Sequence, residues 1–215
     1  MWRKRIVVFD LDDTLYKEVD FLKSAYREIG DYLEAHYPVN GVFERMIWLW
    51  QNGKNAFVDI IREYGLPVTV DELLRMYRHH EPSIELDKKT HEMLSRLSRS
   101  CVLGLITDGR SLTQRNKIKA LGLEQYIEDS HILISEETGY TKPALEPFQF
   151  FMDLYPNDDY CYVGDNPEKD FVAPNQLGWR TICLLDDGRN IHQQIFNLPD
   201  GYLPKYQVKN LIECF

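Results

Sequence analysis

Short apolar runs separated by segments of helical character constrain the fold of this chain more than any other feature of its sequence. The runs lie at 6–9, 101–106, 132–134, 161–163 and 181–185. Uninterrupted apolar runs of this length are typical of parallel strands that are buried on both faces. Segments of helical length, bounded by Gly or Pro, separate the later runs and span 111–121, 143–155 and 168–177. This alternation predicts an α/β fold, in which helices cover both faces of a parallel sheet.

Residues 16–83 interrupt the alternation. This region contains no convincing strand, and its apolar residues recur at helical spacing, as Ile29 and Leu33 do. Turn sequences such as HYPVNG and YGLP divide it into shorter pieces. We therefore predict three or four helices packed as a small bundle. The chain would then comprise a core domain of residues 1–15 and 84–215 and an inserted helical domain of residues 16–83.

The acidic balance of the chain limits its partners. Its 215 residues carry a net charge of −9, whereas a protein that binds the backbone of nucleic acids needs a basic surface. No apolar run approaches membrane length, and the run before Asp10 is too short for a signal peptide. The four cysteines are widely spaced, so we expect reduced, mostly buried thiols. These features predict a cytoplasmic protein that binds neither nucleic acid nor membrane, and they leave its oligomeric state open.

Polar side chains follow the predicted strands at the points where the strands end. They are Asp10 and Asp12 after the first run, Thr107, Asp108 and Gly109 after the second, and Asp165 and Asp170 after the fourth. Lys142 stands after the third run, directly before Pro143. Because ligands of open α/β sheets bind at the carboxyl ends of the strands, we expect these side chains to meet at one site.

Carboxylates crowded at the end of a buried strand repel one another unless a cation or a shared proton offsets the repulsion. Asp10 and Asp165 would supply the hard oxygen ligands that Mg²⁺ prefers. A phosphate on that ion could also contact the Thr107 hydroxyl and the Lys142 ammonium. Asp10 would then be placed to attack phosphorus. Asp12 would protonate the leaving oxygen and later activate water, and a raised pKa would make this proton transfer easier.

The same segments resemble the four motifs of the haloacid dehalogenase-like (HAD) superfamily. FDLDDTL is similar to the first motif, D-x-D-x-T, and LITDG is similar to the second, a Ser or Thr that ends a strand. Lys142 in TKP resembles the third motif, and VGDNPEKD resembles the fourth, an acidic pair. All four occur in the order of the family. The resemblance implies a Mg²⁺-dependent phosphatase on a Rossmann-like sheet, with a small phosphorylated metabolite as its substrate.

The resemblance also implies a role for each matching residue. Asp10 would be the nucleophile, forming an aspartyl-phosphate, and would also bind the metal. Asp12 would be the acid/base and would bind the metal through its backbone carbonyl. Asp165 would be a further metal ligand, and Asp170 would orient Lys142 or the waters of the metal.

Further residues would bind the substrate phosphate. Thr107 and Lys142 would hold the phosphoryl oxygens, with Asp108 and Gly109 beside them and the Gly109 amide facing the phosphate. The insertion of residues 16–83 resembles the helical C1 cap that closes over the site and selects substrates.

Other activities of the same superfamily share parts of this pattern. Haloacid dehalogenases lack the second carboxylate of the first motif, so Asp12 counts against dehalogenation. Phosphosugar mutases keep both aspartates, and phosphonate hydrolases use a cap lysine, so both activities stay open as alternatives. A phospho-accepting signalling module is a more distant alternative, because such modules are about 120 residues long and place their acidic pair differently.

Overall fold

The computed structural model describes residues 4–215, so residues 1–3 of the predicted core domain lie outside the described part. The strands are β1 (Arg5–Phe9), β2 (Val102–Thr107), β3 (Ile132–Ile134), β4 (Asp159–Gly164), β5 (Arg180–Leu184) and β6 (Tyr206–Val208). The first helices are α1 (Glu18–His36), α2 (Val42–Gln51), α3 (Ala56–Tyr64) and α4 (Val70–His79). The later helices are α5 (Lys88–Leu97), α6 (Ser111–Ala120), α7 (Ser135–Thr138), α8 (Glu146–Leu154) and α9 (Val172–Gln176).

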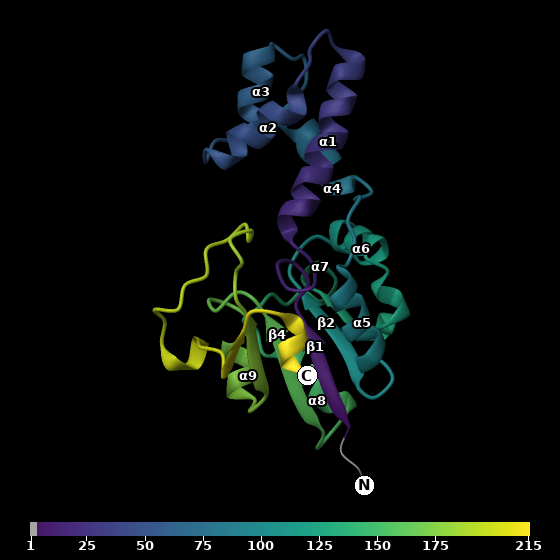
Figure 1. Cartoon of the computed structure of the whole chain (residues 1–215), viewed down its shortest axis with the longest axis vertical. Helices are drawn as coiled ribbons and strands as arrows, with labels where there is room; N and C mark the ends of the chain where they lie inside the picture. The colour runs from purple at the N-terminus through teal and green to yellow at the C-terminus, as the bar shows by residue number, and fades with distance from the viewer. Residues whose placement is uncertain (1–3) are drawn as a thin grey trace.

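Within residues 4–215 the strands form one six-stranded parallel sheet in the order β3-β2-β1-β4-β5-β6. Strand β1 lies in the middle and pairs along its length with β2 on one side and β4 on the other. The sheet forms the lower part of the molecule in Figure 1. The α/β, Rossmann-like fold predicted from the sequence is confirmed.

The two faces of the sheet bury separate sets of alternating side chains. Val7 and Phe9 of β1 point into one cluster, which also holds apolar residues of α5 and α6. Ile6 and Val8 point into the other cluster, which holds residues of α8 and α9. Because successive strand residues face opposite sides, an unbroken apolar run is what a sheet covered on both faces requires.

The sequence placed several element bounds differently from the structure. Strand β6 was not predicted; its burial is partial, and it lacks the apolar run that marked the others. Helix α8 begins at Glu146, not at Pro143, and the proline in its first turn is Pro147. Helix α9 begins only at Val172, because the segment before it folds around the Asp170 side chain, which accepts the Asn166 N–H at 2.8 Å.

Helices α1–α4 form the upper part of the molecule in Figure 1 and have a hydrophobic cluster of their own. The cluster contains Ile29 and Leu33 of α1, Met46 of α2 and Ile60 of α3, together with further apolar residues. Local signals delimit these helices: Thr69 and Glu72 form a capping box at the start of α4. The helical character predicted for residues 16–83 agrees with this arrangement, and the division into two domains remains a prediction.

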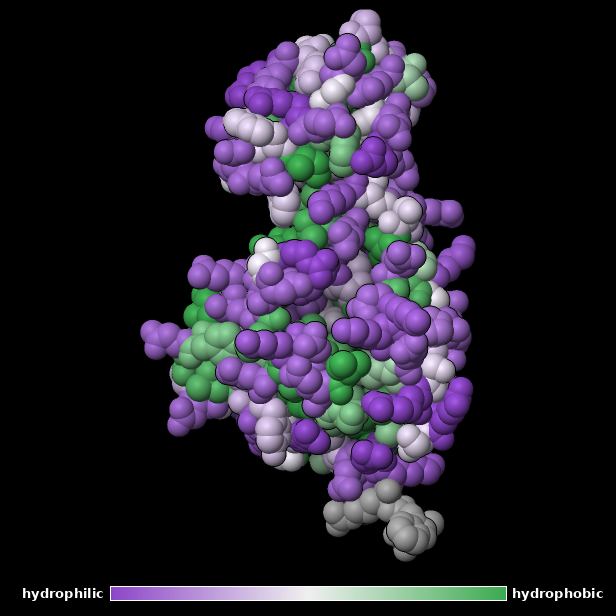
Figure 2. Space-filling model, viewed as in Figure 1, coloured by the Kyte–Doolittle hydropathy of each residue, from purple (hydrophilic) through white to green (hydrophobic). Residues whose placement is uncertain are grey.

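A narrow waist joins the upper helices to the sheet part, and the face of both parts seen in Figure 2 is largely hydrophilic. Helix α6 of the lower part contacts the end of α4. The Thr113 hydroxyl donates to the carbonyl of Arg78 at 3.0 Å, and the Asn116 amide donates to that of His80 at 3.0 Å. All four cysteines are free thiols and three of them are buried, as expected. Among residues 4–215, no helix is both long enough and apolar enough to cross a bilayer.

Gly104, in the middle of β2, lets the Phe151 ring of α8 pack directly on the sheet. A Cβ atom at Gly104 would lie 2.6 Å from the Cε1 atom of Phe151. We expect Gly104→Ala to lower the free energy of unfolding by about 1–3 kcal/mol, because overpacking a close-packed core forces neighbours apart. Urea denaturation measures this change. Gly201→Ala, where a Cβ meets nothing within 4 Å, is the control, and equal stability of the two variants would contradict the expectation.

Candidate active site

The predicted site residues lie at the carboxyl edge of the sheet, around its central strand. Asp10 follows β1, Thr107 ends β2, and Asp165 follows β4. The chain passes from β1 to β2 on one side and to β4 on the other, so β1 is the point where the strand order reverses. Loops at such a point diverge and leave room for a ligand. The structure thus places Asp10, Thr107 and Asp165 at the same edge of the sheet, whereas their roles remain a prediction.

Lys142 is the cation at the centre of the site. Its side chain is fully buried, and its Nζ atom lies 2.5 Å from Asp10 Oδ1 and 2.8 Å from Asp170 Oδ1. Nζ also donates to the Tyr162 hydroxyl at 3.1 Å. Burial acts to lower the pKa of Lys142, but the charges of Asp10 and Asp170 outweigh it and hold the pKa well above its usual range. Lys142 therefore stays charged and offsets the repulsion between the two carboxylates.

Asp170 reaches this position because Gly164 has no side chain. A Cβ atom at Gly164 would lie 2.5 Å from Asp170 Oδ2. That oxygen instead accepts the backbone N–H groups of Asp165 at 3.1 Å and of Asn166 at 2.8 Å. Asp170 thus fixes both Lys142 and the turn that follows β4, which is consistent with the orienting role expected for it.

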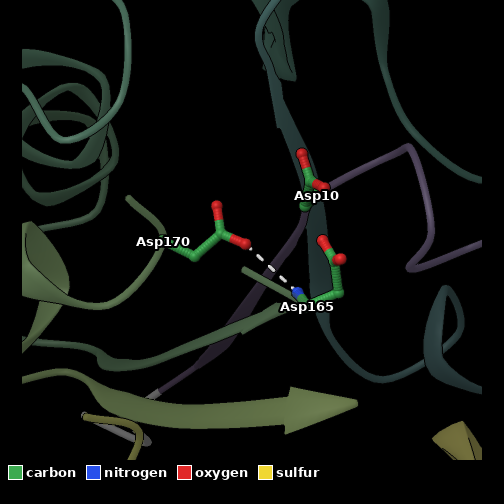
Figure 3. Close-up of side chains that lie close together, drawn as sticks. All are labelled: Asp10, Asp165 and Asp170. Carbon is green, nitrogen blue, oxygen red and sulfur yellow. Dashed lines mark hydrogen bonds between the residues drawn. The ribbon is translucent and has the colours of Figure 1, made fainter. Parts of the chain in front are cut away.

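Asp10, Asp165 and Asp170 form a compact acidic group, drawn in Figure 3. One carboxylate oxygen from each lies within 4.8 Å of the others. Burial and the negative charges of Asp170 and Asp10 raise the pKa of Asp165 to about 9. Burial also raises the pKa of Asp10, to about 6, although Lys142 counteracts it. Carboxylates with pKa values this high are poised to bind a cation, which would favour their ionised form.

The donors present fit a divalent metal ion of the Mg²⁺ type. Asp10 and Asp165 offer buried, hard oxygen atoms close together. Within residues 4–215, the Asp165 carboxylate accepts one hydrogen bond, from the Asn190 amide at 3.1 Å. Asp170, in contrast, is already engaged by Lys142 and by two backbone N–H groups. Mg²⁺ is usually bound by only a few carboxylates and keeps several waters. Asp10 and Asp165 are thus the side chains best placed to hold such an ion.

Thr107 and Asp108, which were predicted to bind phosphate, line the cavity, whereas the amide of Gly109 bonds to a neighbouring side chain. Thr107 is buried at the end of β2 and lines the same cavity as Asp10 and Asp108. Asp108 accepts the backbone N–H of Lys142 at 3.1 Å and so ties the loop before α8 to β2. The Gly109 N–H donates to the Ser135 hydroxyl at 2.9 Å, so this amide does not face the cavity as the sequence suggested. The Gly109 backbone, at a φ of +151°, turns the chain toward α6.

Asp12 is held from the side by helix α6. Lys117 Nζ lies 2.7 Å from Asp12 Oδ1 and 2.9 Å from Oδ2, and the Gln114 amide donates to Oδ2 at 3.0 Å. The Tyr16 hydroxyl donates to Oδ1. Burial acts to raise the pKa of Asp12, but the charge of Lys117 and these hydrogen bonds lower it below its ordinary value. The raised pKa that would make proton transfer easier is thus not present in the free protein, and the sequence analysis did not identify Lys117.

A cavity of about 180 Å³ opens where these residues meet. Its lining is almost entirely polar and comprises Asp10, Asp12, Asp13, Glu18, Thr107, Asp108, Asp165, Asn166, Lys169 and His192. Burial and the charge of Asp12 raise the pKa of Glu18 to about 7. Asp13 links two walls of the cavity, because its carboxylate accepts the backbone N–H of Glu18 at 3.0 Å and of Ile191 at 3.1 Å.

Sequence reasoning missed the residues that surround the motifs. Lys117 and Gln114 belong to α6, and Asn190 and His192 to the segment after β5. A weak signal existed for α6: Gln114 and Lys117 are three positions apart, next to the apolar Ile118, where polar side chains interrupt a buried helix face. No comparable pattern marks the segment after β5.

The raised pKa of Asp165 predicts how stability depends on pH when metal is removed. Between about pH 4 and pH 9 the unfolded chain has lost this proton, whereas the folded chain retains it. The contribution of Asp165 to the free energy of unfolding therefore falls as the pH rises through this window, and the full loss is reached above about pH 9. We expect the midpoint of thermal unfolding in EDTA to decrease from pH 6 to pH 9.

Mg²⁺ should reverse this loss, and most strongly at high pH, where the ion displaces no proton. An ion present at about 100 times its Kd stabilises by about 2.7 kcal/mol, which corresponds to roughly 5–10 °C for a chain of this size. Differential scanning fluorimetry with Mg²⁺ or EDTA measures the shift. Asp165→Asn should flatten the dependence on pH. Midpoints that are equal with and without Mg²⁺ at pH 8.5 would contradict the metal assignment.

Comparison with known proteins identifies relatives along most of the chain. A family model described as haloacid dehalogenase-like hydrolase matches residues 7–184. A glyceraldehyde 3-phosphate phosphatase from Methanocaldococcus jannaschii is 27% identical over 196 residues, which cover 83% of this chain and 84% of the relative. The HAD-hydrolase YfnB of Bacillus subtilis is 24% identical, and the match covers 100% of this chain and 95% of YfnB.

Solved structures share the fold. A magnesium-bound crystal structure of YfnB from Bacillus subtilis superposes with a TM-score of 0.70 at 22% identity, covering 99% of this chain and 97% of that one. A 2-haloacid dehalogenase from Pseudomonas syringae gives a TM-score of 0.61 at 22% identity, with 98% and 96% coverage. At this level of identity the likeness extends to the architecture alone.

Proposed function

The chain belongs to the haloacid dehalogenase-like hydrolase family, and we propose that it is a Mg²⁺-dependent phosphatase that hydrolyses a small phosphorylated metabolite. One observation carries the proposal: Asp10, Thr107 and Asp165, far apart in sequence, line one small polar cavity, and the buried Lys142 contacts Asp10 there. Such a site supplies what phosphoryl transfer chiefly needs, which is correct positioning and neutralised charge. The glyceraldehyde 3-phosphate phosphatase among the relatives supports a small phosphorylated substrate.

In the first step we propose that a carboxylate oxygen of Asp10 attacks phosphorus. The new bond forms as the bond from phosphorus to the leaving oxygen breaks, and Asp12 donates a proton to that oxygen. The bound metal ion would neutralise charge on the phosphate. The pKa of Asp12 is low in the free protein, but a phosphate dianion beside it would raise that pKa and allow it to bring a proton.

In the second step water attacks the aspartyl-phosphate. Asp12, again ionised, takes a proton from this water, and the bond between phosphorus and Asp10 breaks to release inorganic phosphate. Lys142 and Thr107 hold the phosphoryl oxygens in both steps. The Lys142 side chain is fully buried and its Nζ atom contacts Asp10. It would therefore reach the phosphoryl group only on the side where Asp10 attacks.

We further propose that helices α1–α4 act as a cap for this site. Glu18, the first residue of α1, already lines the cavity. Ile191, in the segment after β5, packs against the hydrophobic cluster of these helices. The free thiols and the acidic balance support the cytoplasmic location and the absence of a nucleic-acid partner that we propose.

Replacement of the nucleophile tests the proposal directly. We expect Asp10→Asn to lower kcat for p-nitrophenyl phosphate in the presence of Mg²⁺ by at least ~10³-fold, because the amide cannot form the covalent intermediate. EDTA should abolish the wild-type activity, and added Mg²⁺ should restore it. Asp31→Asn, at an exposed position of α1, is the matched control and should behave as wild type. Full turnover by Asp10→Asn would remove Asp10 from this role.

Product analysis separates the phosphatase from the alternatives. Incubation with a sugar monophosphate should release inorganic phosphate, whereas an isomeric sugar phosphate would indicate a mutase. A long-lived phosphoprotein after treatment with acetyl phosphate would indicate a phospho-accepting module instead. Release of phosphate from a phosphonate would indicate the phosphonate hydrolase.

A further inference from the structure

Helix α6 places two buried polar side chains against two different residues of the site. Gln114 and Lys117 are one helical turn apart and are 2% and 3% exposed. Lys117 contacts both carboxylate oxygens of Asp12. Gln114 donates to Asp12 Oδ2 at 3.0 Å and to the Thr107 hydroxyl at 2.6 Å. These two side chains thus connect the first motif with the second.

The ion pair between Lys117 and Asp12 is not explained by stability alone. Its Nζ atom also lies 4.4 Å from the centre of the Phe21 ring, and Asp12 is its carboxylate partner among residues 4–215. Removing a lysine from water is unfavourable, and a buried ion pair often stabilises a fold no more than an apolar pair of the same volume would. The pair does fix one orientation of the Asp12 carboxylate, whose side chain stays 20% exposed and lines the cavity.

The Gln114 amide determines how the Thr107 hydroxyl can act. Because the Thr107 oxygen accepts a hydrogen bond from Gln114, its own proton is left to be donated to another group. Thr107 lines the cavity at the end of β2, so an oxygen of a bound phosphate is a suitable acceptor. The same amide nitrogen holds Asp12, so Gln114 sets the relative placement of the hydroxyl and the carboxylate.

We propose that Lys117 and Gln114 are positioning residues of the active site. Lys117 orients the Asp12 carboxylate for proton transfer, and Gln114 directs the Thr107 hydroxyl toward the phosphoryl group. This inference rests on the proposed function, because it assumes that Asp12 transfers the proton. Without Lys117, the carboxylate keeps the Tyr16 hydroxyl on Oδ1 and the Gln114 amide on Oδ2, but it loses the one cation that contacts both oxygens and is held less firmly for proton transfer.

The dependence of the rate on the leaving group tests the role of Lys117. An alkoxide leaves only when it is protonated, whereas p-nitrophenolate leaves readily as an anion. We expect Lys117→Met to lower kcat/KM for glycerol 3-phosphate by ~100-fold, since general acid catalysis contributes ~10²–10⁴-fold. The kcat/KM for p-nitrophenyl phosphate should fall by less than about 5-fold, because its leaving group needs no proton. Lys119→Met, at an exposed position of the same helix, should leave both values unchanged.

Asp12→Asn provides the reference for the same assay. It should show the same preference for the better leaving group, and adding Lys117→Met to it should change the preference no further, because both changes act on one step. The double variant also removes the unpaired carboxylate that Lys117→Met alone would leave, so it serves if the single variant unfolds. If Asp12→Asn shows no preference, or the wild type is inactive, the proposed function fails.

The inference alone fails if Asp12→Asn shows the preference and Lys117→Met does not. A Lys117→Met variant that slows both substrates equally, or that is as fast as wild type on both, overturns the positioning role. Gln114→Met tests the other half: we expect it to weaken competitive inhibition by inorganic phosphate about 5-fold, as for the loss of one oriented hydrogen bond. An unchanged inhibition constant overturns the role of Gln114.

Discussion

The buried contact of Lys142 with Asp10 and Asp170 is the interaction on which the site depends. Two carboxylates this close could not both be ionised in a buried position without a cation between them. Lys142 supplies one charge, but burial, together with the negative charges of Asp170 and Asp10, still raises the pKa of the neighbouring Asp165 to about 9. The acidic group therefore carries more negative charge than Lys142 balances, and a divalent cation would offset the excess.

The positions of the motif residues could be predicted because sheet topology determines them. Parallel strands all end at one edge, so Asp10, Thr107 and Asp165 had to approach one another once β1, β2 and β4 were recognised as neighbours. Strong apolar runs revealed these strands. Strand β6 was not predicted because it is short and only partly buried. The start of α8 was misplaced because Pro143 lies before the helix, beside the buried Lys142.

The contacts around the motifs could not be predicted because they depend on side chains at a distance in sequence. Lys117 reaches Asp12 across 105 positions, and its charge lowers the pKa of Asp12, which burial alone would raise. The Gly109 amide likewise donates to a side chain distant in sequence, the hydroxyl of Ser135 at the start of α7. Spacing within a motif specifies where a residue lies along its strand. The surrounding helices then decide its charge state and its hydrogen bonds.

Strand β1, which precedes Asp10, is paired on both sides from Ile6 to Phe9. In native proteins, backbone amides of such central strands exchange with solvent only through the largest openings, whereas peripheral elements open separately and more often. Helices α1–α4 have their own hydrophobic cluster and can loosen without breaking the pairing of β1. Asp10, the residue that would bond to phosphorus, thus follows a strand whose opening requires the loss of pairing on both sides, whereas the helices above it could open without that loss.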